Sequence, residues 1–142
     1  MRLSIRNQFA GEVVAVAVGE AMGTVRVRLD AGPEVVAAIT AEAVRDLGLA
    51  EGSAVLVLLK STEVAVATGA VDRISIRNRI PGVVAAVDHG AVMTTVKISF
   101  NGGDQLTAAI TRDGAEDLGL EAGTAVTALV KSAEVSIALP EA

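Results

Sequence analysis

The sequence repeats itself at a constant shift of 71 residues, and this repeat constrains the fold more than any other feature. Residues 4–7, Ser-Ile-Arg-Asn, return at 75–78, and the Lys-Ser pair at 60–61 returns at 131–132. The shift holds without a gap from residue 3 to residue 67, where about 30 of roughly 65 aligned positions are identical. We therefore expect two tandem domains, at residues 1–68 and 74–142, joined by a linker at 69–73, and any site in one copy should have a twin in the other.

The composition predicts more buried surface than either copy can supply alone. Hydrophobic residues make up 51% of the 142 residues, whereas domains of about 65 residues bury only about 60% of their unfolded surface. We therefore expect the two halves to pack together and the chain to form an oligomer. The longest apolar runs, such as residues 13–18 and 55–59, are far shorter than a membrane-spanning helix. No signal-peptide pattern follows Met1, so the cytoplasm is the expected compartment.

Several classes of partner and chemistry are disfavoured by composition. The chain has no cysteine, which excludes disulfides, zinc-thiolate sites and cysteine nucleophiles. The net charge is −5, with 17 acidic against 12 basic residues, whereas nucleic-acid binders normally carry a basic face. Aromatic stacking platforms are also lacking, because Phe9 and Phe100 are the only aromatic residues and do not occupy matching positions in the repeat. We expect neither a nucleic acid nor a membrane as partner.

Each copy has the pattern of several short strands. Residues 24–29 alternate apolar and polar side chains with a period of two, as a half-buried strand does. The other strands expected in the first copy lie at residues 3–8, 12–18, 35–39, 53–60 and 63–67, with Gly11 separating the first two. Turns are expected at 19–23 and 30–33, and at 101–104 in the second copy.

One short helix is expected in each copy. Thr40 suits an N-cap because its hydroxyl can accept a hydrogen bond from an amide of the first turn, and Glu42 follows at the favourable end of the helix dipole. Gly48 supplies a left-handed stop, and residues 111–119 repeat the pattern. The fold class predicted is mainly β, with two tandem OB-fold-like small β-barrels that each carry one short helix.

The polar residues kept in both copies are hydrogen-bond donors. Ser4 and Arg6 are two apart on an extended segment, so both side chains point to one face. Arginine offers a planar, permanently charged fork and serine a hydroxyl, which together suit an anion with several oxygens. Lys60 and Ser61 place an ammonium and a hydroxyl at a strand end, and Thr40 lies at a helix start, where backbone amides favour negative charge.

The same donors recur in the second copy, as Ser75, Arg77, Thr111, Lys131 and Ser132. No Asp or Glu belongs to the set, so the pattern predicts a site for an oxyanion and not for a metal cation. A structural alternative exists for each residue: Arg6 as a surface charge, Lys60 as a solubilising strand end, Thr40 as a cap alone. Duplicated ancestry also accounts for part of the match between the copies.

Catalysis has little support in the sequence. His89 is the single histidine, and its counterpart in the first copy is Val18, so we interpret it as a surface or turn residue. Glu63 and Glu134 recur, but one carboxylate per copy makes no acid–base pair, and we expect strand-edge charges. We expect Asn7, which points away from Arg6, to shape the turn toward Gly11. The chain is interpreted as a binding protein without catalytic cofactor, and not as an enzyme.

The motifs taken together resemble those of a known family. Ser-x-Arg-Asn near the start, a glycine a few residues on, Ala-Ile-Thr, Leu-Gly-Leu-x-x-Gly and a Lys-Ser pair are similar to the molybdenum-pterin-binding (Mop) domain. Residues 3–67 and 74–138 each match this pattern from end to end. The whole chain therefore resembles a tandem-domain (di-Mop) molbindin.

This resemblance implies an OB-like barrel that binds molybdate or tungstate for cytoplasmic storage and homeostasis. It also implies a homotrimer of six domains with strands exchanged between neighbours. The ligands carried over by motif are Ser4, Arg6, Thr40, Lys60 and Ser61 with their second-copy twins Ser75, Arg77, Thr111, Lys131 and Ser132. A second type of site, near the three-fold axis, would use mainly backbone amides around the Gly19 and Gly90 turns. A regulatory module that acts in trans on a transporter or regulator is the alternative, because similar domains are appended to such proteins.

Overall fold

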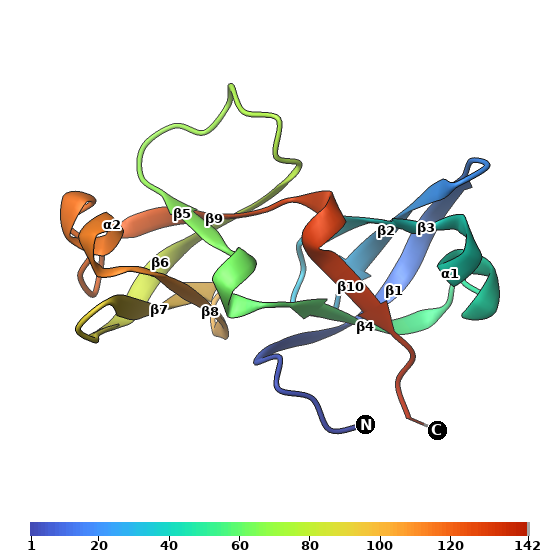
Figure 1. Cartoon of the computed structure of the whole chain (residues 1–142), viewed down its shortest axis with the longest axis horizontal. Coiled ribbons are helices and arrows are strands. Elements are labelled where there is room, and N and C mark those ends of the chain that lie inside the picture. Colours follow the sequence, from blue (N-terminus) through green and yellow to red (C-terminus); the bar gives the residue numbers. More distant parts are fainter. Residues whose placement is uncertain (142) are drawn as a thin grey trace.

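The computed structural model describes residues 1–141 and consists of two antiparallel five-stranded sheets, one for each copy of the repeat (Figure 1). The first copy contains β1 (Asn7–Val18), β2 (Met22–Leu29), β3 (Glu34–Thr40), α1 (Ala41–Asp46), β4 (Ala54–Leu59), the 3-10 turn η1 (Ser61–Glu63) and β5 (Ala65–Ala67). The second copy contains β6 (Asn78–His89), β7 (Met93–Phe100), β8 (Asp104–Thr111), α2 (Arg112–Asp117), β9 (Ala125–Val130), η2 (Ser132–Glu134) and β10 (Val135–Ala138).

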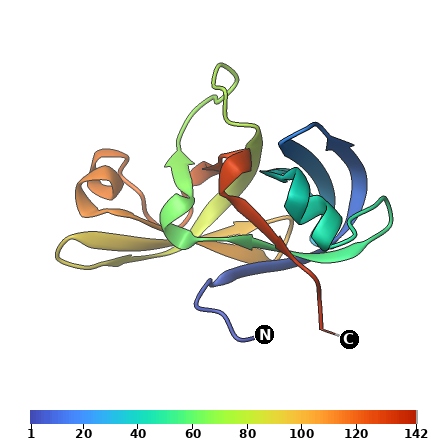
Figure 2. The same cartoon turned by 45° about the vertical axis from the view of Figure 1, so that its right-hand side comes forward.

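The two copies exchange their last strands. The first sheet has the order β10-β4-β1-β2-β3 and the second β5-β9-β6-β7-β8, so each ends on a strand of the other copy. Val135 of β10 pairs with Leu59 of β4, and Ala65 of β5 pairs with Leu129 of β9. In Figure 2 the green β5 and the red β10 each cross to the opposite half. Neither half therefore completes its sheet without the other.

Each sheet curls until its edges meet. The edge strands β10 and β3 of the first sheet are in contact, as are β5 and β8 of the second. This curvature makes each sheet a nearly closed small barrel, which matches the predicted mainly-β, OB-like class with one short helix per copy. Because the closing strand is exchanged, the barrels do not coincide with continuous stretches of sequence.

Gly11 lies inside a strand and does not end one. We expected it to separate strands at residues 3–8 and 12–18, but β1 runs through it without interruption from Asn7. A Cβ at Gly11 would lie 2.7 Å from the carbonyl oxygen of Arg28 and 2.7 Å from a methyl group of Val27. The glycine therefore permits close approach of the neighbouring strand β2, a role that strand glycines commonly have.

Both predicted helix caps are present. The hydroxyls of Thr40 and Thr111 each accept a hydrogen bond of 3.1 Å, from the amides of Ala43 and Gly114. The glycines that follow the helices, at positions 48 and 119, have φ of 61° and 62°, the left-handed conformation expected for a helix stop. The 3-10 turns were not predicted: Glu63 and Glu134, expected at strand edges, lie in η1 and η2.

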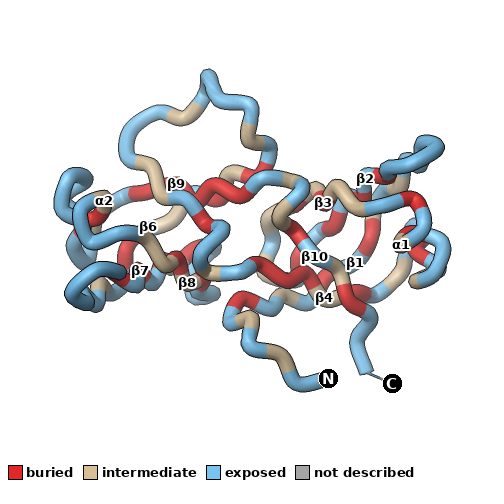
Figure 3. Tube along the Cα trace, in the orientation of Figure 1, coloured by how far each residue is buried: buried red, intermediate tan, exposed pale blue. Residues whose placement is uncertain are grey.

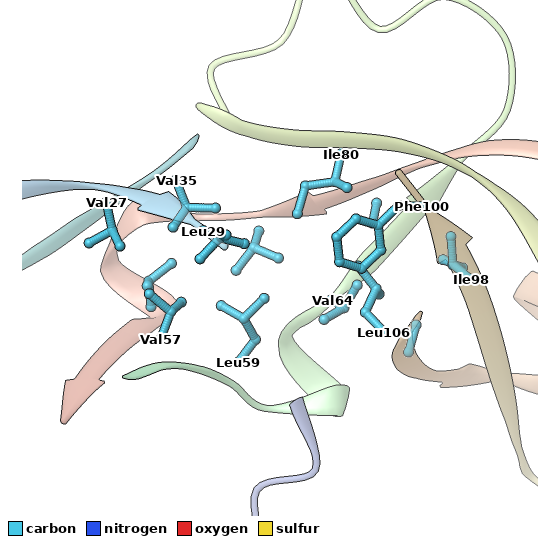
Figure 4. Packing of buried hydrophobic residues seen from close by; sticks show 14 of the residues in the cluster. Val27, Leu29, Val35, Val57, Leu59, Val64, Ile80, Ile98, Phe100 and Leu106 are labelled. Carbon is cyan, nitrogen blue, oxygen red and sulfur yellow. The ribbon is translucent and has the colours of Figure 1, made fainter. Parts of the chain in front are cut away.

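One hydrophobic core extends through both halves. Leu29, Val57 and Leu59 from the first sheet belong to the same cluster as Ile98 and Leu106 from the second (Figure 4). The rings of Phe9 and Phe100 meet across the halves at 5.6 Å between centroids, in an edge-to-face arrangement. The expectation that the halves pack together is therefore confirmed.

Exposed segments lie at the periphery of this core. The connection between the halves, residues 68–77, arches away from the body and is largely exposed (Figures 1 and 3). The two ends of the described chain lie close together, where the Met1 amino group forms an ion pair with Glu141. No helix within residues 1–141 is long and apolar enough to cross a membrane.

Candidate oxyanion site

Four of the predicted first-copy donors lie around one surface hollow. Asn7 pairs with Leu59 in the β1–β4 ladder, so Arg6, just before β1, lies across from Lys60, just after β4. The hollow has a volume of about 280 Å³ and is lined by Ser4, Ile5, Arg6, Lys60, Ser61 and Thr62. We call it the Arg6 hollow.

The Arg6 side chain folds back along its own segment. Its Nε donates to the carbonyl of Ser4 at 3.0 Å, and its Nη2 donates to the carbonyl of Leu3 at 3.0 Å. Arg77 is held in the same way, donating from Nε to Ser75 at 3.0 Å and from Nη2 to Ile74 at 3.3 Å. These bonds use part of the guanidinium fork and fix its plane, and the remaining N–H groups stay available to a ligand.

The two predicted threonines lie apart from the other donors of their own copy. Thr111 lines a second hollow of about 380 Å³, beside the Arg6 hollow, which also contains Thr62 and Glu63 from the first copy. Thr40 ends β3, a strand in contact with η2 of the second copy, and does not line the Arg6 hollow. Thr111 therefore lies near η1 of the first copy, and the strand that ends at Thr40 contacts η2 of the second copy, a placement that follows from the strand exchange.

The second copy places its donors by the same register. Asn78 pairs with Val130, so Arg77 and Lys131 flank the end of the β6–β9 ladder as Arg6 and Lys60 do in the first copy. The Ser132 hydroxyl is buried and has no hydrogen-bond partner among residues 1–141. Buried polar atoms without a partner are rare in folded proteins. This hydroxyl could therefore donate a hydrogen bond to an acceptor oxygen of a ligand.

The donor cluster carries uncompensated positive charge. Among the described residues, no ion pair involves Arg6, Lys60, Arg77 or Lys131. The same residues contain no group of three or more His, Cys, Asp and Glu side chains that could hold a metal ion. The local chemistry therefore suits an anion with several acceptor oxygens.

Asn7 and Asn78 have a role that sequence reasoning missed. We expected Asn7 to shape a turn toward Gly11, and this is wrong: its Nδ2 donates to the carbonyl of Thr107, and its Oδ1 accepts from the Thr107 amide, both at 2.8 Å. Asn78 makes the same pair of 2.8 Å bonds with Val36 of β3. Each asparagine directly follows a site arginine and is hydrogen-bonded to a strand of the other copy. The only signal in the sequence was that both copies keep the residue.

The hairpin turns at Gly19 and Gly90 use some of their own amides. Gly19 N–H donates to Met22 and Gly90 N–H donates to Met93, each at 2.8 Å, which closes the two hairpins. These two amides are therefore occupied within the chain, and a ligand at either turn would need other donors. The sites near a three-fold axis remain an expectation from the resemblance.

A charged cluster lies next to the Gly90 turn and has no twin in the first copy. Arg112 donates to the carboxylate of Glu116 at 2.8 Å and to the carbonyl of Gly90 at 3.1 Å. The Arg112 hydrogen bond and charge lower the pKa of Glu116 below its ordinary value of 4.5, with a smaller contribution from the charge of His89. His89 lies at the exposed end of β6, with its Nδ1 2.9 Å from the Thr94 hydroxyl.

The family model of the TOBE domain matches the chain twice, at residues 3–66 and 74–137. The chain belongs to the TOBE domain family. The two TOBE domains lie in tandem, in register with the repeat, and the resemblance to tandem Mop domains is confirmed by the names of the relatives.

Relatives and a solved structure cover the tandem pair of TOBE domains. The chain is 42% identical over 141 residues to the molybdenum-pterin-binding protein MopB of Rhodobacter capsulatus, covering 99% of this chain and 52% of MopB. It is 37% identical over 139 residues to the molybdenum transport protein ModE of Azotobacter vinelandii, covering 98% of this chain and 52% of ModE. The chain thus spans about half the length of these curated relatives.

The solved structure of ModG matches the tandem TOBE pair over its whole length. ModG is described as a cytoplasmic molybdate-binding protein, and its structure contains bound molybdate. It superimposes with a TM-score of 0.95 at 33% identity, covering 99% of this chain and 100% of the ModG chain. The fold expected from the sequence is therefore confirmed.

Proposed function

We propose that this protein binds molybdate, or the closely similar tungstate, without catalysing a reaction, and that it serves cytoplasmic storage and homeostasis of the oxyanion. The observation that carries the proposal is the end-to-end likeness to ModG, a cytoplasmic molybdate-binding protein with the ligand bound in its structure. Both TOBE domains of the chain take part in that likeness, so we assign binding to both.

The donor chemistry supports an oxyanion as the ligand. A tetrahedral dianion offers only acceptors, and the Arg6 hollow offers a guanidinium, an ammonium and three hydroxyls with no carboxylate in its lining. The Ser132 hydroxyl, which has no hydrogen-bond partner among residues 1–141, supports the same ligand class in the second copy. The site residues proposed are Ser4, Arg6, Thr40, Lys60 and Ser61, with Ser75, Arg77, Thr111, Lys131 and Ser132.

The strand exchange refines how these residues would be shared. Since Thr111 lies beside η1, we propose that it serves the oxyanion held near the Arg6 hollow, while Thr40 serves the second-copy site through η2. Each site would then draw on both halves of the chain. The threonine hydroxyls already accept helix-cap bonds but keep one donor hydrogen each for a ligand.

We also propose that the protein assembles as a homotrimer with six domains. Exposed apolar side chains flank both hairpin turns, with Val18 and Met22 at one turn and Val92 and Met93 at the other. Apolar groups gathered at equivalent places are typical of contact surfaces between subunits. The mass of the assembly in solution tests this assignment.

Removal of both site arginines tests the proposed function. Arg6→Ala combined with Arg77→Ala should weaken molybdate binding about 10- to 100-fold at these sites, because each change removes a charge-assisted donor. Isothermal titration calorimetry at low salt measures the loss. Circular dichroism should show an unchanged fold, since both side chains are exposed and bond only to their own segments.

A matched variant controls for charge alone. Arg45→Ala combined with Lys97→Ala removes the same two charges from exposed positions outside the lining of the Arg6 hollow. This variant should bind molybdate like the unchanged protein. Unchanged molybdate affinity in the Arg6/Arg77 variant would contradict the site assignment.

A second candidate function has one observation in its favour. The chain matches about half of ModE of Azotobacter vinelandii, a molybdenum transport protein, so a regulatory module that acts in trans on a transporter or regulator is the alternative. Affinity capture from the native host's lysate with and without molybdate separates the two. A partner retained only with molybdate would favour the module, and capture of no partner would favour storage.

A further inference from the structure

Among the differences between the two candidate sites, one changes the local charge, at the position two residues beyond each site arginine. The first copy has Gln8, whose Nε2 donates to the carbonyl of Ile5 at 2.9 Å. The second copy has Arg79, whose Nε donates to the equivalent carbonyl of Ile76 at 3.0 Å. Arg79 therefore makes the bond that glutamine makes in the first copy, and it adds a guanidinium to that end of the strand.

Arg79 brings this guanidinium next to that of Arg77. Its Nη2 donates to the carbonyl of Ile74 at 2.7 Å, and Nη2 of Arg77 donates to the same oxygen at 3.3 Å. Two permanently charged groups thus converge on one neutral acceptor. Neither forms an ion pair among residues 1–141, so a carboxylate does not offset their repulsion in the described chain.

The register places a third cation on the same side. Arg77 and Arg79 are two residues apart on an extended segment, so both point to one face. Arg79 pairs with Leu129 of β9, and Lys131 lies two residues after Leu129, on that same face. Arg77, Arg79 and Lys131 therefore gather at the β6–β9 end. In the first copy the neutral Gln8 takes the place of Arg79.

We infer that the two sites of one chain are unequal, and that Arg79 makes the second-copy site the tighter one for a doubly charged tetrahedral oxyanion. The inference rests on the proposed function, because it concerns the relative strength of the same sites. An anion between the paired guanidiniums relieves their repulsion and accepts hydrogen bonds from their free N–H groups. Gln8 can donate hydrogen bonds but supplies no charge, so the first-copy site should bind a dianion less tightly.

Exchange of the two residues tests the inference. Arg79→Gln should weaken the tighter class of molybdate sites about tenfold at low salt and flatten the dependence of its affinity on salt, because one charge near the ligand is removed. Gln8→Arg should strengthen the weaker class by a similar factor. Calorimetric titrations at two salt concentrations measure both effects.

The chain supplies the controls. Glutamine is tolerated at this place in the first copy, so Arg79→Gln should keep the fold and the bond to Ile76. Lys97→Gln removes one charge from the same copy, but Lys97 pairs with Ala86, seven residues along β6 from Arg79 and so roughly 20 Å away. At physiological salt that distance exceeds the screening length of about 8 Å, so Lys97→Gln should leave both classes unchanged in the titration at that salt concentration.

The possible results separate this inference from the proposed function. If the unchanged protein shows two classes of molybdate affinity and Arg79→Gln merges them into one, the inference is supported. Molybdate binding whose affinities and salt dependence are the same before and after Arg79→Gln would overturn it and leave the proposed function intact. Absence of any molybdate binding by the unchanged protein would overturn both.

Discussion

At the scale of single residues, Asn7 and Asn78 connect the candidate sites to the packing of the two halves. Each side chain is only 3% exposed and forms two 2.8 Å hydrogen bonds with the backbone of a strand from the other copy. An amide side chain can do this because it carries a donor and an acceptor side by side, as a backbone peptide does. The arginine just before each asparagine is thereby held at the junction between the halves.

Asn7→Ala should lower the free energy of unfolding by on the order of 2–3 kcal/mol. The change removes two hydrogen bonds and leaves the amide and carbonyl of Thr107 without partners in a part-buried position. Urea denaturation measures the loss, with Gln8→Ala as the control because Gln8 is exposed and bonds only within its own segment. Equal unfolding midpoints for the two variants would contradict the role assigned to Asn7.

The Arg112–Glu116 pair gives a prediction about pH. Since Arg112 lowers the pKa of Glu116, the ionised pair stabilises the fold above the ordinary pKa of 4.5, and that contribution is lost as the pH falls through the lowered value. Arg112→Gln should therefore raise the Glu116 pKa toward 4.5, as measured by NMR titration of its side-chain carboxyl. Both side chains are exposed, so we expect little change in stability at neutral pH. An unchanged Glu116 titration would contradict the assigned cause.

At the scale of secondary-structure elements, local signals in the sequence were sufficient for most strands and both helices. The alternation at residues 24–29, the threonine caps and the left-handed glycines each reflect interactions within a few residues, which a single sequence contains. The exchange of β5 and β10 was different, because each of these strands could join β4 or β9, which are equivalent edges of the two sheets. Because the copies are alike, both pairings satisfy similar hydrogen bonds, so the residues alone did not distinguish them.

Two equivalent proline substitutions test the strand exchange. Ser136 in β10 and Ala65 in β5 are exposed twins, so replacement of either by proline disturbs an edge strand without altering the core. Ser136→Pro should speed amide hydrogen exchange at least about tenfold in β4 of the first copy, by weakening that edge. Ala65→Pro should have the same effect in β9 of the second copy.

Strands that paired within their own copy would give the opposite result. Ser136→Pro would then expose β9 and Ala65→Pro would expose β4, which would contradict the observed sheet order β10-β4-β1-β2-β3. Hydrogen exchange followed by mass spectrometry resolves the two strands, because β4 and β9 lie far apart in the sequence. Each variant thus serves as the control for the other.

At the scale of the whole molecule, the repeat and the high apolar content predicted that the halves would pack together, and one core through both sheets confirms this. The candidate sites were harder to assemble from sequence. The donor types could be recognised in each copy, but the placement of Thr111 beside η1 depends on the exchanged strands. The partnership of Arg77 and Arg79 likewise depends on side chains that fold back onto one carbonyl.

The net charge of −5 does not conflict with an anionic ligand. Charges beyond about 8 Å are largely screened at physiological salt, so the local donors dominate at the site. The exchanged strands also make each half dependent on the other, which agrees with the proposal that each site draws on both halves. A ligand that joins donors from the two halves should stabilise the fold, because it binds the native state alone.

Native mass spectrometry of the protein titrated with molybdate, and in parallel with sulfate, tests the central claim most directly. One spectrum gives the mass of the assembly and the number of ions bound to it. We predict a trimer that takes up several molybdate ions and leaves sulfate unbound. An assembly that binds no molybdate would contradict the account.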